Sequence, residues 1–212
     1  YRDGKVRTVV FEQSNLISDT TIDAGPEETG TRILFEPDNT LFVGYSFRTA
    51  YIETMLRNYT YLNTGLTIMF NGKRIVSRNG LVDLLSDRMT ADALYPIIHL
   101  KSNDIEIAIT HAHQYGEEYY SFVNGQHTSQ GGTHQSAFKE LVAQTIHDFF
   151  SAKNFEYCDI RNGIVAAIAV NIQEPVFESQ TTVKLGSKDM SPEGGLSMNK
   201  FVGDFIKSNV DN

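Results

Sequence analysis

The sequence has a single cysteine, Cys158, and is short of basic residues, with 18 lysines and arginines against 26 acidic residues in 212 positions. One cysteine excludes an internal disulfide and a cluster of thiolate metal ligands, a usage that fits a reducing cytoplasm. The net charge of −8 argues against a main DNA-binding surface, because affinity for duplex DNA comes largely from basic patches. Any contact with nucleic acid is therefore expected through other parts of the polypeptide.

Long hydrophobic runs and familiar catalytic motifs are also missing. No apolar run approaches the roughly 20 residues that a membrane-spanning helix needs, so no membrane association is expected. The chain has no G-x-S-x-G motif, no phosphate-binding P-loop and no cysteine and histidine placed for covalent chemistry. His111 and His113 share one strand face, but no third ligand is near them, so no metal site is expected.

Residue patterns predict a mixture of strands and helices. β-Branched and apolar runs predict strands at residues 5–12, 31–36, 66–70, 73–76, 94–100, 105–113, 119–124 and 163–172. Apolar residues at helical spacing predict helices at 47–62, 80–87, 135–152 and 195–210. Proline and glycine indicate a loop over 18–30, and Asn71-Gly72 is typical of a type I′ turn.

The order of these elements predicts an α+β fold with two layers, a sheet against helices. We expect the strands at 105–113 and 119–124 to close an antiparallel hairpin. The nearly continuous apolar run at 163–172 predicts a strand that is buried on both faces. The strand, helix and strand between residues 119 and 172 form a β-α-β unit, whose crossover is expected to be right-handed.

The stretch from Phe122 to Phe138 joins a strand to the longest predicted helix through the pair Gly131-Gly132. Paired glycines allow positive φ or a close approach of another backbone. Thr133 or Ser136 is expected to cap the helix, whose first N–H groups need an acceptor. This end of the helix therefore suits either an anion or a neighbouring loop.

Two motifs carry a family resemblance. Residues 122–138 read F-V-N-x(6)-G-G-T-H-x(3)-F, and residues 175–185 read P-x-F-x-x-Q-T-x-x-K-L. Together they resemble the transducer region of type IIA DNA topoisomerase B subunits, the ATPase subunits of gyrase and bacterial topoisomerase IV. R-D-G-K at 2–5, T-G-T-R-I-L-F-E-P-D at 29–38 and L-N-T-G-L at 62–66 agree with the same family, in the same order.

This resemblance implies an architecture and a set of partners. Residues 1–79 would be the C-terminal part of a GHKL-type ATPase domain, and residues 80–212 a transducer domain with a β-α-β crossover. The full-length enzyme would use ATP and Mg²⁺, form a homodimer of B subunits on ATP binding, and act on DNA in the cytoplasm with the topoisomerase A subunit. The start without Met favours a piece of a longer chain, so the catalytic glutamate, the Mg²⁺ ligand, the adenine-binding aspartate and the glycine-rich lid are expected before Tyr1. The isolated piece is therefore expected to be inactive.

The resemblance also implies roles for individual residues. Gln180 matches a glutamine that donates to the γ-phosphate of ATP, whereas Thr182 stands where the family has a lysine. Either Lys184 supplies the missing charge from two positions on, or phosphate sensing is weakened. Thr31 matches a threonine near the adenine, and Arg2 an arginine at the mouth of the pocket. Four residues are expected to hold the loop before the helix: Gly131, Gly132, Thr133 and His134.

Two other functions stay open at this point. Thr182 in place of lysine favours a non-catalytic dimerisation or interaction module on the same scaffold. A DNA-repair ATPase of the MutL type would also place a transducer lysine near ATP, although the F-V-N…G-G-T-H stretch argues for a topoisomerase. The short Asn71-Gly72 hairpin, where gyrase-like chains tend to carry a longer insertion, favours topoisomerase IV over gyrase.

Overall fold

The computed structural model describes residues 1–26, 29–150 and 154–210, and the chain divides into two compact units, Tyr1–Arg48 and Thr49–Asn212. This division differs from the boundary at residue 80 that the family resemblance implies. The boundary at residue 80, between an ATPase part and a transducer, stays a prediction.

The first unit is built on a two-stranded antiparallel hairpin of β1 (Lys5–Glu12) and β2 (Asn15–Asp23). Strand β1 confirms the predicted bounds. The loop predicted over 18–30 is wrong for residues 18–23, which belong to β2, and residues 27 and 28 of that loop lie outside the described residues. The reason is local: Gln13 and Ser14 both take positive φ, a two-residue turn that returns the chain directly into a second strand.

The strand predicted at residues 31–36 is not formed in the first unit. Residues 31–36 have no strand assignment and pair with no other described segment, and Ile33, Leu34 and Phe35 are exposed. The pattern of apolar residues suits a strand, but a strand forms only where a neighbour completes its ladder of hydrogen bonds.

The second unit holds a five-stranded sheet in the order β5-β6-β9-β7-β8. Its strands are β5 (Ile98–Lys101), β6 (Ile105–His111), β7 (Glu118–Val123), β8 (Gln126–His127) and β9 (Ile164–Val170). Strand β9 lies in the middle, antiparallel to β6 and parallel to β7. The predicted hairpin between residues 105–113 and 119–124 is therefore wrong, because β9, buried along almost its whole length, takes the place between them.

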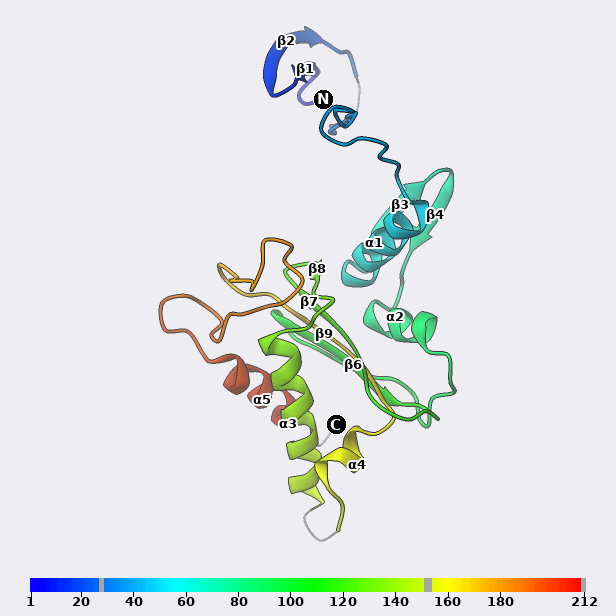
Figure 1. The fold of residues 1–212 in the computed structure, drawn as a ribbon, viewed down its shortest axis with the longest axis vertical. Helices are drawn as coiled ribbons and strands as arrows, with labels where there is room; N and C mark the ends of the chain where they lie inside the picture. The colour runs from blue at the N-terminus through cyan, green and yellow to red at the C-terminus, as the bar shows by residue number, and fades with distance from the viewer. Residues whose placement is uncertain (27–28, 151–153, 211–212) are drawn as a thin grey trace. The chain divides into compact units, whose positions relative to one another are not determined.

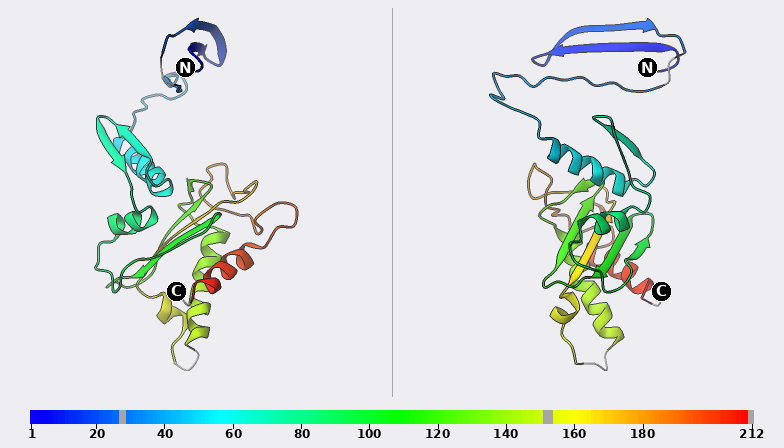
Figure 2. Two further views of the ribbon diagram at one scale, coloured as in Figure 1. Left: turned by 180° about the vertical axis from the view of Figure 1, so that it is seen from behind. Right: turned by 90° about the vertical axis from the view of Figure 1, so that its right-hand side faces the viewer.

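Helices cover both faces of this sheet. Figures 1 and 2 show α3 (Thr133–Phe149) and α5 (Met198–Ser208) on one side and α2 (Leu81–Arg88) on the other. Alternate residues of one strand point to opposite layers: Ile107 and Ile109 pack with α3 and α5, whereas Ala108 packs with α2. The predicted α+β class and the parallel β7-α3-β9 unit are confirmed, whereas the predicted two layers are wrong, because apolar residues of the sheet are buried on both faces.

The remaining elements follow the predictions closely. Helix α1 (Thr49–Leu62) leads to the hairpin of β3 (Thr67–Phe70) and β4 (Lys73–Val76), and Asn71 and Gly72 both take the positive φ of a type I′ turn. A short helix that was not predicted, α4 (Tyr157–Arg161), precedes β9. Pro96, which lacks an N–H, shortens the strand predicted at 94–100 to β5. Helix α3 begins two residues earlier than predicted, and residues 151 and 152 of that prediction lie outside the described residues.

Candidate functional site

Residues 176–187, which we call the Gln180 loop, fold back on themselves after β9. Phe177 and Leu185 form an antiparallel bridge, and the N–H of Glu178 donates to the carbonyl of Lys184 at 3.0 Å. The N–H of Gly186 donates to the carbonyl of Val176 at 2.8 Å. These bonds make a narrow two-stranded neck that carries Gln180 at its tip.

The neck is anchored to the glycine pair before α3. The N–H of Leu185 donates to the carbonyl of Gly131, and the Leu185 carbonyl accepts from the N–H of Thr133, both at 3.1 Å. The N–H of Gln130 donates to the carbonyl of Val183 at 2.9 Å, and the Leu185 side chain is fully buried. The sequence predicted either an anion or a neighbouring loop at the N-terminal end of α3. The structure places a neighbouring loop, the Gln180 loop, at this end.

Gly132 can only be a glycine at this contact. Its φ is 136°, and a Cβ placed on it would lie 2.4 Å from the carbonyl oxygen of Leu185. Backbone atoms cannot move aside as the end of a flexible side chain can. The close approach of the two backbones therefore depends on the missing side chain.

The expected cap of α3 is wrong. Gly132 is the N-cap residue, and no side chain accepts from the first turn. Thr133 already lies inside the helix, and its hydroxyl donates to the carbonyl of Ser187 at 2.5 Å. Ser136 contributes its backbone N–H to the carbonyl of Gly132. Thr133 thus ties the helix to the far end of the Gln180 loop.

His134 lies beneath this junction and is completely buried. The Thr128 hydroxyl donates to the carbonyl of Ser121 at 2.8 Å, so it accepts from Nε2 of His134 at 3.2 Å. Nδ1 then carries no proton, which suits a nitrogen that has no hydrogen-bond partner. Burial lowers the pKa of His134 to about 4, so the ring is neutral at pH 7.

Asn124 is a site residue that the sequence reasoning missed. Its amide nitrogen donates to the carbonyl of Ile172 at 2.9 Å, and its amide oxygen accepts from the N–H of Ile172 at 2.8 Å. This pair of bonds fixes the chain where it leaves β9 toward the Gln180 loop. The sequence did contain a signal for this role: an asparagine directly follows the apolar strand that ends in Phe122 and Val123, where a side-chain amide can bond to the backbone of another segment.

The tip of the loop is exposed and strained. Gln180 is exposed, the N–H of Thr182 donates to the carbonyl of Ser179 at 3.2 Å, and the hydroxyls of Ser179 and Thr181 lie 2.7 Å apart. Thr182 has a φ of 55°, an unfavourable conformation for a β-branched residue. Such strain is more common at functional loops than elsewhere.

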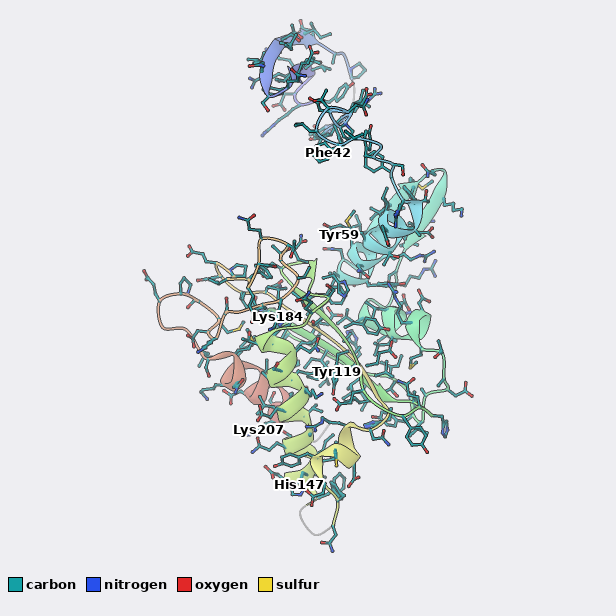
Figure 3. The ribbon with its side chains drawn as sticks, viewed as in Figure 1. Phe42, Tyr59, Tyr119, His147, Lys184 and Lys207 are labelled. Atoms are coloured by element: carbon teal, nitrogen blue, oxygen red, sulfur yellow. The ribbon has the colours of Figure 1, made fainter. Side chains whose placement is uncertain are left out.

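Lys184 already has a partner in this structure. Its Nζ lies 2.8 Å from a carboxylate oxygen of Glu178 on the opposite side of the neck. Figure 3 shows Lys184 near the N-terminal end of α3. Gln180 and Lys184 therefore belong to one loop, with the amide at its tip and the ammonium at its neck.

Comparison with known proteins identifies the family. The DNA gyrase B family model matches residues 51–211. The chain belongs to the DNA gyrase B family. It is 36% identical over 206 residues to the B subunit of DNA topoisomerase 4 from Borreliella burgdorferi, covering 97% of this chain and 34% of that protein. It is 32% identical over 207 residues to the B subunit of DNA gyrase from Helicobacter pylori strain J99, covering 88% and 27%.

The fold agrees with this membership of the gyrase B family. The 43K ATPase domain of Thermus thermophilus gyrase B, solved in complex with an aminocoumarin, superposes with a TM-score of 0.74 at 24% identity, covering 99% of this chain and 62% of that one. The chain spans about a third of the length of the curated relatives it matches. The DNA-repair alternative is not favoured by these matches.

The other two residues that the family resemblance predicts as nucleotide contacts, Thr31 and Arg2, lie in the first unit. Thr31 is exposed, and Arg2 is exposed with its guanidinium 3.6 Å from the carboxylate of Asp3. Gln180 and Lys184 lie in the second unit. That all four meet around one nucleotide stays a prediction.

The imidazoles and carboxylates of the described ranges make no metal centre. No group of three or more histidine, cysteine, aspartate or glutamate residues in residues 1–26, 29–150 and 154–210 is arranged to hold an ion. His111 instead contacts the Tyr95 hydroxyl through Nδ1 and the Ile160 carbonyl through Nε2, both at 2.6 Å. Both of its ring nitrogens therefore have partners within the fold at the end of β6. No helix in these ranges is long and apolar enough to cross a membrane.

Proposed function

We propose that this chain is the later part of the ATPase region in the B subunit of an ATP-dependent type IIA DNA topoisomerase. Residues 1–79 would complete the ATPase domain and residues 80–212 would form the transducer. The full-length protein would couple ATP binding and hydrolysis to the passage of one DNA duplex through another. Its partners would be DNA, the A subunit and a second copy of itself. The enzyme would act in the cytoplasm.

One observation supports this proposal most strongly: the neck of the Gln180 loop is fixed while its tip is exposed. Leu185 is bonded to Gly131 and Thr133, and Glu178 is bonded to Lys184. A loop held in this way can present an amide at a defined place without first becoming ordered, which lowers the entropic cost of binding a ligand. Gln180 would donate its amide N–H to the terminal phosphate of ATP, and Lys184 would supply positive charge.

Two residues of the first unit are further proposed nucleotide contacts. Thr31 has a hydroxyl that can both donate and accept near an adenine, and Arg2 has an exposed guanidinium for the mouth of the pocket. The exposed amide and the ammonium suit a phosphate group chemically. Mg²⁺ would be bound by other residues of the full-length enzyme. A nucleotide whose terminal phosphate contacts the Gln180 loop would favour the closed dimer of B subunits over the open state. The reason is that a ligand shifts an equilibrium toward the state that it binds more tightly.

The experiment uses the full-length protein and compares Gln180→Ala with wild type. ATP turnover in the presence of DNA is expected to fall about 100-fold, the lower end of the loss for one donor to developing charge. Strand passage should fall in parallel. Gln173→Ala, which removes an exposed amide from another part of the same unit, is the matched control. Equal activity of Gln180→Ala and wild type would contradict the proposal.

Thr182 favours a second candidate, a non-catalytic dimerisation module on the same scaffold. The family lysine is replaced here, and the threonine adopts a φ of 55°. Thr182→Lys in the full-length protein separates the two functions. A protein without ATP turnover before and after this change, with dimerisation intact, would support the second candidate.

A further inference from the structure

The charge in the Gln180 loop is confined to one pair of residues. Between residues 176 and 187, Lys184 is the only basic residue and Glu178 the only acidic one. Nζ of Lys184 lies 2.8 Å from Oε2 of Glu178, and the N–H of Glu178 also donates to the Lys184 carbonyl. The ammonium is therefore neutralised by a carboxylate of its own loop.

We propose that Glu178 is a positioning residue that competes with the terminal phosphate of a nucleotide for the ammonium of Lys184. This inference rests on the proposed function. Without nucleotide, Glu178 holds Lys184 at the neck of the loop. When a polyphosphate arrives next to Gln180, the ammonium exchanges the carboxylate for a phosphate oxygen. Glu178 thereby lowers the affinity of the loop for ATP.

The exposure of the pair makes this exchange feasible. The side chains of Lys184 and Glu178 are 41% and 54% exposed, so water and salt screen their attraction. Ion pairs of this kind contribute little to stability, and breaking one costs correspondingly little. A phosphate carries more negative charge than a carboxylate and so competes well for the same ammonium. If Glu178 kept its contact, its carboxylate would repel the phosphate across the shared cation.

Thr182 explains why this competition matters in this chain. A lysine at 182 would give the loop a second cation, which the carboxylate of Glu178 could not neutralise at the same time as Lys184. With threonine there, Lys184 alone can meet the phosphate. The acidic residue opposite Lys184 therefore controls all of the positive charge in the loop.

The test measures the affinity of the full-length protein for a non-hydrolysable ATP analogue by isothermal titration. Glu178→Gln keeps the shape of the side chain and removes its charge. The dissociation constant is expected to fall about two- to fivefold, the range for loss of one exposed ion pair. The KM for ATP should fall similarly while kcat changes little. Raising the salt concentration should reduce the difference, because it acts through charge.

A matched control separates this effect from any loss of a surface ion pair. Lys200 and Asp204 in α5 also lie 2.8 Å apart, with side chains 60% and 57% exposed. Asp204→Asn breaks this pair in the same unit, far along the sequence from the loop, and is expected to leave nucleotide affinity unchanged. An unchanged or weaker affinity in Glu178→Gln would overturn the inference. An equal gain in Asp204→Asn would overturn it as well.

Two further variants show whether the competition is for Lys184. Lys184→Met should weaken binding, and Glu178→Gln added to it should have no further effect. The exchanged pair, Glu178→Lys with Lys184→Glu, keeps an ion pair across the neck but moves the cation, so it should bind as weakly as Lys184→Met. Wild-type affinity in the exchanged pair would overturn the inference.

The same measurements distinguish failure of this inference from failure of the proposed function. If Gln180→Ala weakens nucleotide binding but Glu178→Gln has no effect, only this inference fails. If substitution of neither Gln180 nor Lys184 changes nucleotide binding, the proposed function fails.

Discussion

The β1–β2 hairpin of the first unit and the central strands of the second all contain β-branched residues but differ completely in burial. Phe11 and Ile22 in the hairpin are 64% and 65% exposed, whereas Ile107 and Ile168 in the five-stranded sheet are 1% and 0% exposed. β-Branched residues predict a strand at β1 and at the central strands of the second unit alike, whereas most of β2 was predicted as a loop. The difference lies in the layers around each sheet, because helices cover both faces of the second sheet.

This difference determines where the stability of the chain resides. A two-stranded hairpin without a packed face is marginal by itself, since its hydrogen bonds replace similar bonds to water. No helix is assigned among the described residues of Tyr1–Arg48, so the side chains of β1 and β2 gain little from burial there. The sheet of the second unit buries apolar side chains on both faces, and this burial is the main favourable contribution to folding.

The largest effect that tests this comparison is expected from Ile168→Ala at the centre of β9. Ile168 is fully buried against α3 and α5, so its truncation should lower the free energy of unfolding by about 4 kcal/mol. Ile22→Ala, the same change in β2, should cost less than about 1 kcal/mol. Urea unfolding followed by circular dichroism measures both, since the chain has no tryptophan. Equal losses would contradict the assignment of the stable core to the second unit.

Local sequence patterns were sufficient to predict most helices and strands, but not to predict which strands pair with one another. Strand β1, helix α1, the Asn71-Gly72 turn and the buried β9 follow from spacing and turn chemistry within each segment. The pairing of β6 with β9 depends on which strands best fill the centre of the sheet, and this is decided by contacts across about 60 residues of sequence. Residues 31–36 show the same limit, because a strand pattern without a neighbouring strand stays irregular.

A smaller effect is expected from Gly132→Ala, which tests the contact between the Gln180 loop and α3. The new Cβ would overlap the Leu185 carbonyl in a backbone conformation that alanine avoids, at a cost of about 3 kcal/mol. Gly125→Ala is the matched control: its φ is 81°, but nothing lies within 4 Å of the added Cβ. Only the backbone strain applies there, about 1 kcal/mol. Urea unfolding that gives equal losses for the two variants would contradict the close contact.

The candidate site was predictable where a residue type itself carries the reason. Gly131-Gly132 predicts a close approach, and the Q-T motif draws attention to Gln180. Asn124 and Glu178 were missed because their roles depend on segments distant in sequence or on the partner across a loop: Ile172 for the first and Lys184 for the second. The capping role expected of Thr133 failed because its hydroxyl bonds to Ser187 instead.

The smallest effect concerns pH and His134, the residue under the junction of α3 and the Gln180 loop. Burial lowers the pKa of His134 to about 4 in the folded chain, against 6.5 for an exposed histidine. Between pH 6.5 and 4 the unfolded chain binds a proton that the folded chain does not, so stability falls as the pH falls through this window. The loss attributable to His134 is expected to be about 2 kcal/mol at a pH of about 5. Comparing unfolding free energies of wild type and His134→Gln across this range isolates the contribution, because other groups titrate alike in both. If the unfolding free energies of the two proteins change with pH in parallel, the pKa of His134 does not change on folding. The imidazole would then be accessible to protons in the folded chain, because the junction opens without unfolding.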